Sequence, residues 1–216
     1  MNALTVRALL PRPTDRAVFI GQTGSGKTTL ARYLARYRTF FVGIFPKGPL
    51  SAHGWAGTLV KSLDALGRLK TLEHPRILYA PNVDELSDPD ALDAFFAWVY
   101  ERENTTLYID ELYAVTRGDI APPALVACYT RGREKNVETW GATQRPSRVP
   151  QIAFTEAEHV YCFRLRAPQD RERVEQLAGI DADAIALLPK YDFFYAPQDG
   201  DVAGPLRLNL LARRAA

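Results

Sequence analysis

The octapeptide GQTGSGKT, residues 21–28, constrains the fold of this chain more than any other feature. It follows a short apolar run, Ala17–Ile20, and opens a run with helical character, Lys27–Tyr37. Glycines at these spacings let the backbone curl so that successive N–H groups face inward, and a helix N-terminus adds a favourable dipole for an anion. A strand, a glycine-rich loop and a helix in this order predict a phosphate-binding loop.

Apolar runs alternate with helical runs along most of the chain. The expected strands are Ala17–Ile20, Thr39–Phe45, Arg76–Ala80, Thr105–Asp110, Thr139–Gln144 and His159–Leu165. The expected helical stretches are Lys27–Tyr37, Trp55–Leu69, Pro89–Glu103, Pro123–Glu134 and Pro168–Gly179. The strands are apolar throughout, which is typical of a parallel sheet covered on both faces. Tyr191–Pro197 and Leu206–Leu210 could pair as a C-terminal hairpin. We therefore predict an α/β fold with a mainly parallel central sheet, helices on both faces and a C-terminal hairpin.

Composition limits the class of protein. With 216 residues and 47% hydrophobic composition, the chain is expected to form a single domain over residues 1–216. The net charge of +2 does not indicate nucleic-acid binding by itself, so any such binding must come from local patches. Cys128 and Cys162 lack metal-ligand spacing and are interpreted as buried thiols in a reducing compartment. The absence of a long apolar run predicts a soluble protein that is not exported.

The phosphate-binding loop predicts ATP and Mg²⁺ as ligands. Lys27 would reach the β and γ phosphates, and the Thr28 hydroxyl would ligate magnesium. The predicted nucleotide-binding residues are Gly21, Gln22, Thr23, Gly24, Ser25, Gly26, Lys27, Thr28 and Thr29. The alternative is a glycine-rich turn that fits the pattern by chance.

Two acidic residues end a later strand. In the run LYIDE, the strand delivers Asp110 and then Glu111 to the carboxyl end of the sheet. Asp110 can hold the magnesium through water, and Glu111 can polarise a water for attack on the γ phosphate. A solvated strand end or a helix cap is the alternative for both residues.

The next strand ends in an amide, Gln144, within TWGATQRPSR. Ligands of doubly wound sheets gather at the carboxyl ends of the strands, so this amide is expected to face the same phosphate. Gln144 can accept a hydrogen bond from the attacking water and donate one to a γ-phosphate oxygen. It would then report whether that phosphate is present, unless it only caps the following turn.

Together these motifs resemble the FtsK/HerA superfamily of DNA-pumping ATPases. The match is strongest over REKNVETWGATQRPS, Arg133–Ser147, and continues more loosely over His159–Ile180. The resemblance implies a RecA-like P-loop NTPase fold of the ASCE type and a homo-oligomeric ring, a hexamer in the family. It also implies that a neighbour's arginine completes each ATP site. Arg133 matches that arginine, and Arg131 is the near alternative.

Within the superfamily, the chain looks most like the small genome-packaging ATPases of membrane-containing icosahedral viruses. This resemblance implies translocation of double-stranded DNA, a capsid or packaging-vertex partner, no membrane span, and a location in the host cytoplasm or on the virion. Loops that face the DNA channel in related rings carry Arg117, Arg145 and Arg148 here. Such arginines grip phosphates without reading bases, although ordinary surface positions would explain them as well.

One position departs from the family pattern. Several members carry an acidic residue after the second strand, whereas this chain has Lys47 in IFPKG. Contact with phosphate and simple exposure both stay open for Lys47. The aromatic runs FFAWVY and YDFFYAP are interpreted as core and not as base-stacking platforms, because a helix and a strand need buried faces.

Other functions also fit a phosphate-binding loop. A small P-loop kinase acting on a nucleoside or metabolite would use Arg131 and Arg133 on a closing lid. A filamentous-phage or secretion-type assembly ATPase is a second alternative, and a ring protein whose nucleotide only stabilises assembly is a third. The pairing of Glu111 with Gln144 favours water as the acceptor of the phosphoryl group.

Overall fold

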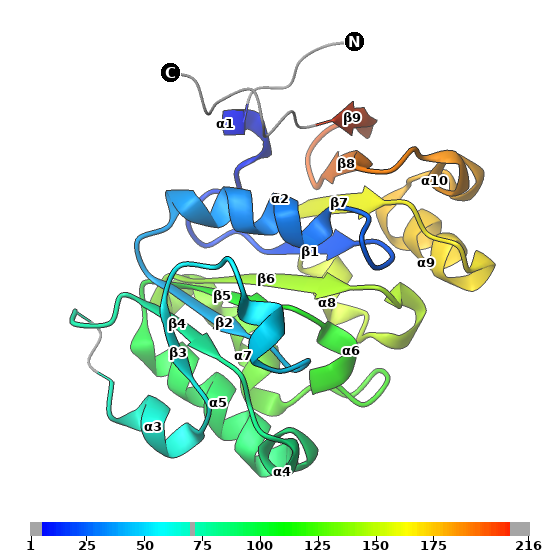
Figure 1. Ribbon diagram of the computed structural model, residues 1–216. Coiled ribbons are helices and arrows are strands. Elements are labelled where there is room, and N and C mark those ends of the chain that lie inside the picture. Colours follow the sequence, from blue (N-terminus) through cyan, green and yellow to red (C-terminus); the bar gives the residue numbers. More distant parts are fainter. Residues whose placement is uncertain (1–5, 70–71, 208–216) are drawn as a thin grey trace.

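The computed structural model describes residues 6–69 and 72–207. Within these residues a nine-stranded sheet runs through the molecule in the order β3-β4-β2-β5-β6-β1-β7-β8-β9 (Figure 1). The strands are β1 (Ala17–Ile20), β2 (Phe41–Ile44), β3 (Thr58–Val60), β4 (Arg76–Tyr79), β5 (Thr105–Ile109), β6 (Val137–Thr143), β7 (His159–Phe163), β8 (Asp192–Pro197) and β9 (Ala203–Arg207). Strands β1 to β7 pair in parallel, and β8 and β9 add an antiparallel hairpin. The predicted α/β fold with a mainly parallel sheet and a C-terminal hairpin is confirmed.

Helices cover both faces of this sheet. The longer ones are α2 (Lys27–Leu34), α5 (Pro89–Arg102), α7 (Pro123–Arg131), α9 (Pro168–Ala178) and α10 (Ala182–Leu187). The shorter ones are α1 (Val6–Leu9), η1 (Ala35–Tyr37), η2 (Pro49–Ala52), α3 (Leu63–Gly67), α4 (Val83–Ser87), α6 (Leu112–Val115), η3 (Gly132–Lys135), η4 (Pro146–Arg148) and α8 (Ile152–Thr155). Figure 1 shows α2 on one side of the sheet and α5 on the other. No helix within the described ranges is long and apolar enough to cross a membrane.

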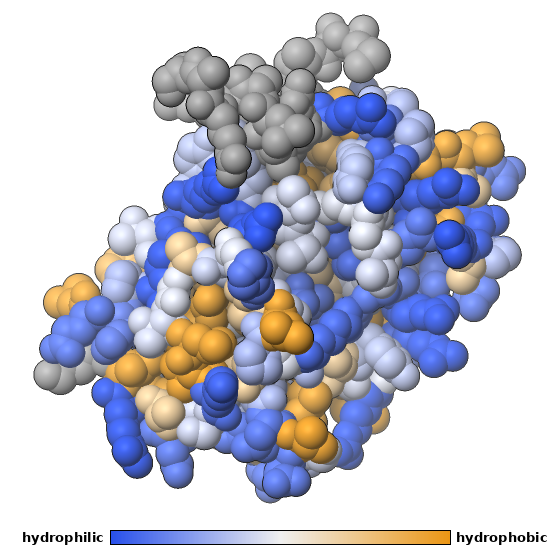
Figure 2. Space-filling view, in the orientation of Figure 1, coloured by the Kyte–Doolittle hydropathy of each residue, from blue (hydrophilic) through white to orange (hydrophobic). Residues whose placement is uncertain are grey.

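Alternation along the strands produces two hydrophobic cores. In β1, Val18 and Ile20 point to the core under α5 and α7, and Phe19 points to the core under α2. All four residues of β1 are fully buried, as expected for a strand covered on both faces. The face of the molecule seen in Figure 2 is largely hydrophilic, and hydrophobic side chains gather over the region of β3, β4 and α3. That region includes the edge strand of the sheet.

The structure corrects one predicted element and locates another. Residues Trp55–Leu69 were expected to be helical, but they contain the edge strand β3 before the short helix α3. Helix α3 begins only after Ser62, whose hydroxyl caps the Ala65 N–H at 3.3 Å. The C-terminal hairpin pairs β8 with β9, which begins at Ala203. Residues 208–210 of the predicted last strand lie outside the described residues.

Parallel strands bring several chain segments to one edge of the sheet. The residues that follow β1, β2, β5 and β6 all leave from the carboxyl edge, because these strands pair in parallel and in register. Gly141 in β6 leaves room for Leu112, the residue after Glu111: a Cβ at position 141 would collide with the Leu112 side chain. The same Cβ would lie 2.9 Å from the Tyr129 hydroxyl. Packing of α6 against β6 therefore depends on this glycine.

We predict that Gly141→Ala lowers the free energy of unfolding by roughly 1–3 kcal/mol, because the added methyl overpacks a filled site. Gly67→Ala is the matched control, since nothing lies within 4 Å of a Cβ there. That change should be neutral or stabilising, because alanine is the better helix former. Urea unfolding of both variants checks the prediction, and equal midpoints for Gly141→Ala and the parental protein would contradict it.

Candidate functional site

The loop between β1 and α2 has the backbone of a phosphate cradle. Gly21, Gly24 and Gly26 all have positive φ, at 156°, 74° and 118°. A Cβ on Gly21 would lie 2.6 Å from Ser25 Oγ and 2.7 Å from the Phe163 Cβ, so only glycine fits there. The loop is held to the neighbouring strands by hydrogen bonds from Gly21 N to the Thr143 carbonyl and from Gln22 N to the Arg164 carbonyl, both 3.1 Å.

Polar groups inside this loop fit a phosphate. Ser25 Oγ, a hydroxyl that can donate a hydrogen bond to a phosphate, is one of the buried side-chain atoms that have no hydrogen-bond partner in the described part of the chain. Lys27 is only 6% exposed, and burial lowers the pKa of its ammonium group, while the nearby Glu111 acts in the opposite direction. A buried cation with this little compensation is stabilised by an anionic ligand. The loop from Gly21 to Thr28 therefore has the backbone and the charge to hold the phosphates of a nucleotide, and the nucleotide-binding role of residues 21–29 stays a prediction.

Thr28 and Asp110 converge on the hydroxyl of Tyr108. Tyr108 donates a hydrogen bond of 3.0 Å to Asp110 Oδ1. Burial raises the pKa of Tyr108 well above its ordinary value, the charge of Asp110 adds to this, and a hydrogen bond with Thr28 opposes it. Burial also raises the pKa of Asp110 to about 6, against the hydrogen bond from Tyr108 and the charges of Lys47 and Lys27. A hydroxyl and a carboxylate brought together in this way can hold Mg²⁺ beside the phosphates.

The Glu111 carboxylate connects three segments of the chain. Its Oε1 accepts a hydrogen bond from Gln144 N at 3.2 Å, and its Oε2 accepts one from Gln144 Nε2 at 2.9 Å. Lys47 Nζ lies 3.0 Å from the same Oε2. The Gln144 side chain also accepts a hydrogen bond from Thr23 Oγ1 at 2.5 Å, so it bridges Glu111 to the phosphate loop.

The sequence alone did not decide whether Lys47 contacts phosphate or is simply exposed. The structure puts its ammonium against Glu111, with the side chain 47% exposed and that of Glu111 7% exposed. The loop after β2 reaches the site because β2 pairs with β5, whose end carries Asp110 and Glu111. The sequence did hold a signal for Lys47: a residue that follows the carboxyl end of a strand parallel to β5 lies near the same edge of the sheet as Asp110 and Glu111.

The two candidate trans-acting arginines lie at the opposite edge of the sheet. Arg131 and Arg133 precede β6, and Arg133 pairs with Glu158 at 2.7 Å, just before β7. Strand β6 has seven residues, and at about 3.3 Å per residue it separates these arginines from Gln144 by roughly 20 Å. Arg131 and Arg133 are both exposed. Neither is near the phosphate loop of its own chain.

The three predicted DNA-contact arginines are exposed and lie after the carboxyl ends of β5 and β6. Arg148 lies over the ring of Tyr113 in α6, with its guanidinium carbon 5.9 Å from the centroid. Arg145 Nη1 lies 3.8 Å from Asp170 in α9, and Arg117 Nη2 donates to the Ser87 carbonyl at 3.4 Å. Helix α6 directly follows Glu111, so Arg148 contacts the segment that carries the acidic pair.

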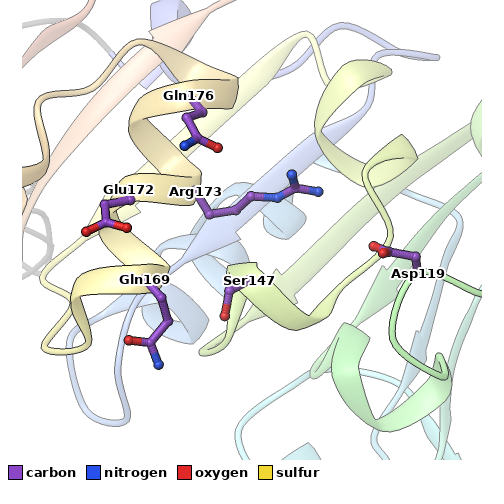
Figure 3. A pocket seen from close by; sticks show the side chains of 6 residues that line it. All are labelled: Asp119, Ser147, Gln169, Glu172, Arg173 and Gln176. Carbon is purple, nitrogen blue, oxygen red and sulfur yellow. The ribbon is translucent and has the colours of Figure 1, made fainter.

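A polar groove of about 250 Å³ lies beside the turn that follows Gln144. Its lining residues come from α9, η4 and the segment before α7: Asp119, Ser147, Gln169, Glu172, Arg173 and Gln176. Figure 3 shows the Arg173 side chain extending from α9 toward the side of the groove that carries Asp119. Asp170, 2% exposed, accepts hydrogen bonds from both Ser147 N and Ser147 Oγ, at 3.1 and 2.6 Å. This anchoring fixes the turn that positions Gln144.

No family model and no curated protein matches the sequence. The fold is similar to that of the genome-packaging NTPase B204 from Sulfolobus turreted icosahedral virus 2 in complex with AMPPCP. That comparison has a TM-score of 0.73 and 16% identity, and it covers 91% of this chain and 99% of that one. VirB4 of Thermoanaerobacter pseudethanolicus is similar with a TM-score of 0.61 and 10% identity, covering 85% of this chain and 86% of that one.

A third similar structure is the pCW3 conjugation coupling protein TcpA with ATPγS. It has a TM-score of 0.59 and 13% identity, and the alignment covers 88% of this chain and 59% of that one. The likeness at these identities is one of fold. It confirms the predicted P-loop NTPase fold.

The raised pKa of Asp110 predicts that the stability of the protein without nucleotide or metal depends on pH. The folded protein holds the Asp110 proton more tightly than the unfolded chain does, so the protonated side chain stabilises the fold. This stabilisation is fully present below pH 3.8 and is lost as pH rises through about 6. Asp110→Asn should therefore raise the free energy of unfolding at pH 8 by up to about 3 kcal/mol, at about 1.4 kcal/mol per pKa unit. The gain should disappear near pH 4.

Urea unfolding in the presence of a chelator measures this effect at the two pH values. Asp201→Asn, at an exposed position between β8 and β9, is the matched control and should change stability little at either pH. An Asp110→Asn protein that is less stable than the parental protein at pH 8 would show that the carboxylate is not penalised by burial.

Proposed function

We propose that this protein is an ATP-hydrolysing translocase of double-stranded DNA that packages a viral genome into a preformed capsid. One observation carries the hydrolytic part: the Glu111 carboxylate and the Gln144 amide lie in hydrogen-bond contact beside the phosphate loop. The packaging part rests on the fold shared with a genome-packaging NTPase and on the exposed arginines near the same edge.

In the proposed reaction, Lys27 and the backbone of the glycine loop bind the β and γ phosphates. Thr28 and Asp110 would hold Mg²⁺, which would neutralise charge on the phosphates. Tyr108 orients the Asp110 carboxylate through its 3.0 Å hydrogen bond. Lys27, Tyr108 and Asp110 are buried, which keeps their side chains in place without reorganisation during the reaction.

Glu111 acts as the general base toward water, and Gln144 orients that water and contacts the γ phosphate. Both carboxylate oxygens of Glu111 accept hydrogen bonds: Oε1 from Gln144 N, and Oε2 from Gln144 Nε2 and Lys47 Nζ. Arrival of the γ phosphate offers Gln144 and Lys47 a second anionic partner. Glu111 would then exchange one of these contacts for the attacking water.

Arg133 serves the ATP site of a neighbouring subunit, with Arg131 as the alternative. The length of β6 separates Arg133 by roughly 20 Å from Gln144, which lies beside the phosphate loop of the same chain. At that distance the arginine can stabilise a transition state only at the site of another chain. Its 61% exposed side chain is available for that contact once the pair with Glu158 opens. We propose a ring of identical subunits, a hexamer as in the FtsK/HerA family.

Arg117, Arg145 and Arg148 are proposed to contact the phosphates of the DNA in the central channel. The contact of Arg148 with Tyr113 would link this grip to α6, which begins directly after Glu111. Capsid or packaging-vertex proteins are the proposed partners, and the host cytoplasm or the virion is the proposed location.

The test of the function is ATP turnover with and without double-stranded DNA. Turnover that DNA stimulates is expected for a translocase. Turnover only with a small hydroxyl acceptor would instead identify a kinase, and bound but unhydrolysed ATP would identify a protein whose nucleotide stabilises assembly. Strand displacement of a triplex-forming oligonucleotide from duplex DNA then distinguishes translocation from stimulated hydrolysis alone, which an assembly ATPase could also show.

Glu111→Gln should retain ATP binding and lose hydrolysis, because an amide can hydrogen-bond water but cannot accept its proton. Lys27→Ala should instead weaken binding itself. Nucleotide affinity and single-turnover hydrolysis measure the two effects separately. A Glu111→Gln protein that hydrolyses ATP at the parental rate would remove Glu111 from the role of base.

Arg133→Ala should leave ATP binding intact and lower hydrolysis by roughly a thousandfold or more, as for other arginine fingers. Mixing Arg133→Ala subunits with Glu111→Gln subunits should restore part of the activity, because some interfaces then join an intact Glu111 to an intact Arg133. Each variant alone is the control. If the mixture stays inactive although subunit exchange is demonstrated, either Arg131 is the trans-acting arginine or hydrolysis requires all sites of the ring to be intact.

A further inference from the structure

The strand order divides the surroundings of the phosphate loop into two sides. Strands β5 and β6, which end at Asp110, Glu111 and Gln144, lie on one side of β1, and β7 and β8 lie on the other. A γ phosphate that faces Glu111 is directed toward the first side. The sugar and the base of the same nucleotide would then extend toward the ends of β7 and β8, on the other side of the loop.

Tyr191 lies on that second side. It directly precedes β8, and because β8 runs antiparallel to β7, the start of β8 lies at the carboxyl edge, where Phe163 is the partner of Phe193. A Cβ built on Gly26, the residue that opens α2, would lie 3.3 Å from Cδ1 of Tyr191. The tyrosine ring thus lies beside the C-terminal end of the phosphate loop.

The burial of Tyr191 differs from that of its neighbours in the run YDFFYAP. Phe193 and Tyr195 are 1% and 6% exposed and belong to the core, as the sequence predicted for this run. Tyr191 is 54% exposed, so the ring contributes little to that core.

The backbone at Tyr191 has a φ of 72°, a conformation that a bulky residue adopts rarely and at a cost. Lys190 adds a second feature, because its Nζ lies 4.8 Å from the centroid of the Tyr191 ring. A cation over an aromatic ring restrains the ring and is favourable by itself. It also adds positive charge beside the phosphate loop, where a polyanionic nucleotide would bind. A strained, exposed aromatic residue held in this place is better suited to a ligand contact than to packing.

We propose that Tyr191 is the platform on which the purine base of the bound nucleotide stacks, an inference that rests on nucleotide binding at the phosphate loop. Aromatic stacking uses the π face that all bases share and reads none of their edges. The subsite would therefore take the bases of ATP and GTP alike. Stacking on Tyr191 would make the affinity for a nucleoside triphosphate higher than the affinity for inorganic tripolyphosphate.

Calorimetric titrations with two probes test this contact. The first probe is AMPPCP with Mg²⁺, which carries the base, and the second is inorganic tripolyphosphate with Mg²⁺, which lacks it. Tyr191→Ala should weaken AMPPCP binding about tenfold and change tripolyphosphate binding less than about twofold, because only the first ligand loses a stacking partner. Tyr191→Phe keeps a ring and should bind AMPPCP nearly as the parental protein does.

Tyr37→Ala is the matched control. Tyr37 is 50% exposed and lies in η1, which follows the far end of α2 from the phosphate loop. This variant should bind both probes as the parental protein does. Parental affinity of Tyr191→Ala for AMPPCP would overturn the proposal. Equal weakening of both probes would also overturn it, since the ring would then support the loop instead of the base. A parental protein that binds neither probe would contradict the proposed function itself.

Discussion

The hydrogen bonds of the Glu111 carboxylate hold the candidate site together. Gln144 satisfies both oxygens from the end of β6, Lys47 adds a charge from the loop after β2, and Thr23 ties Gln144 to the phosphate loop. A buried carboxylate is tolerated only with partners of this kind. The three segments that meet at Glu111 are therefore coupled, and a ligand that displaces one contact changes the others.

The sequence was enough to predict the parts of the site that lie at strand ends. Parallel strands put their carboxyl ends at one edge, so a glycine loop after β1, an acidic pair after β5 and an amide after β6 were expected at that edge, and the strand order β5-β6-β1 makes them neighbours. Each of these signals is local: a spacing of glycines, or a polar residue directly after an apolar run. The roles proposed for Lys27, Asp110 and Gln144 rest on residue type and position in the same way.

Contacts set by strand order and by backbone conformation could not be predicted in this way. Lys47 reaches Glu111 because β2 pairs with β5, and no local pattern states that pairing. Tyr191 lies in an aromatic run in which Phe193 and Tyr195 are buried, and no local pattern predicts its positive φ or its place beside Gly26. The edge strand β3 was missed because it has only three residues, two of them exposed.

A crystal structure with AMPPCP and Mn²⁺ is the most direct test that the carboxyl edge of β1, β5 and β6 is a metal–nucleotide site. The account predicts one anomalous peak next to the phosphates, with Thr28 Oγ1 as a direct ligand at about 2.1 Å, as for Mg²⁺, and with Asp110 beside it. It further predicts the γ phosphate within reach of Lys27 and Gln144. A metal held without Thr28 and Asp110, or a nucleotide bound away from the glycine loop, would contradict the account.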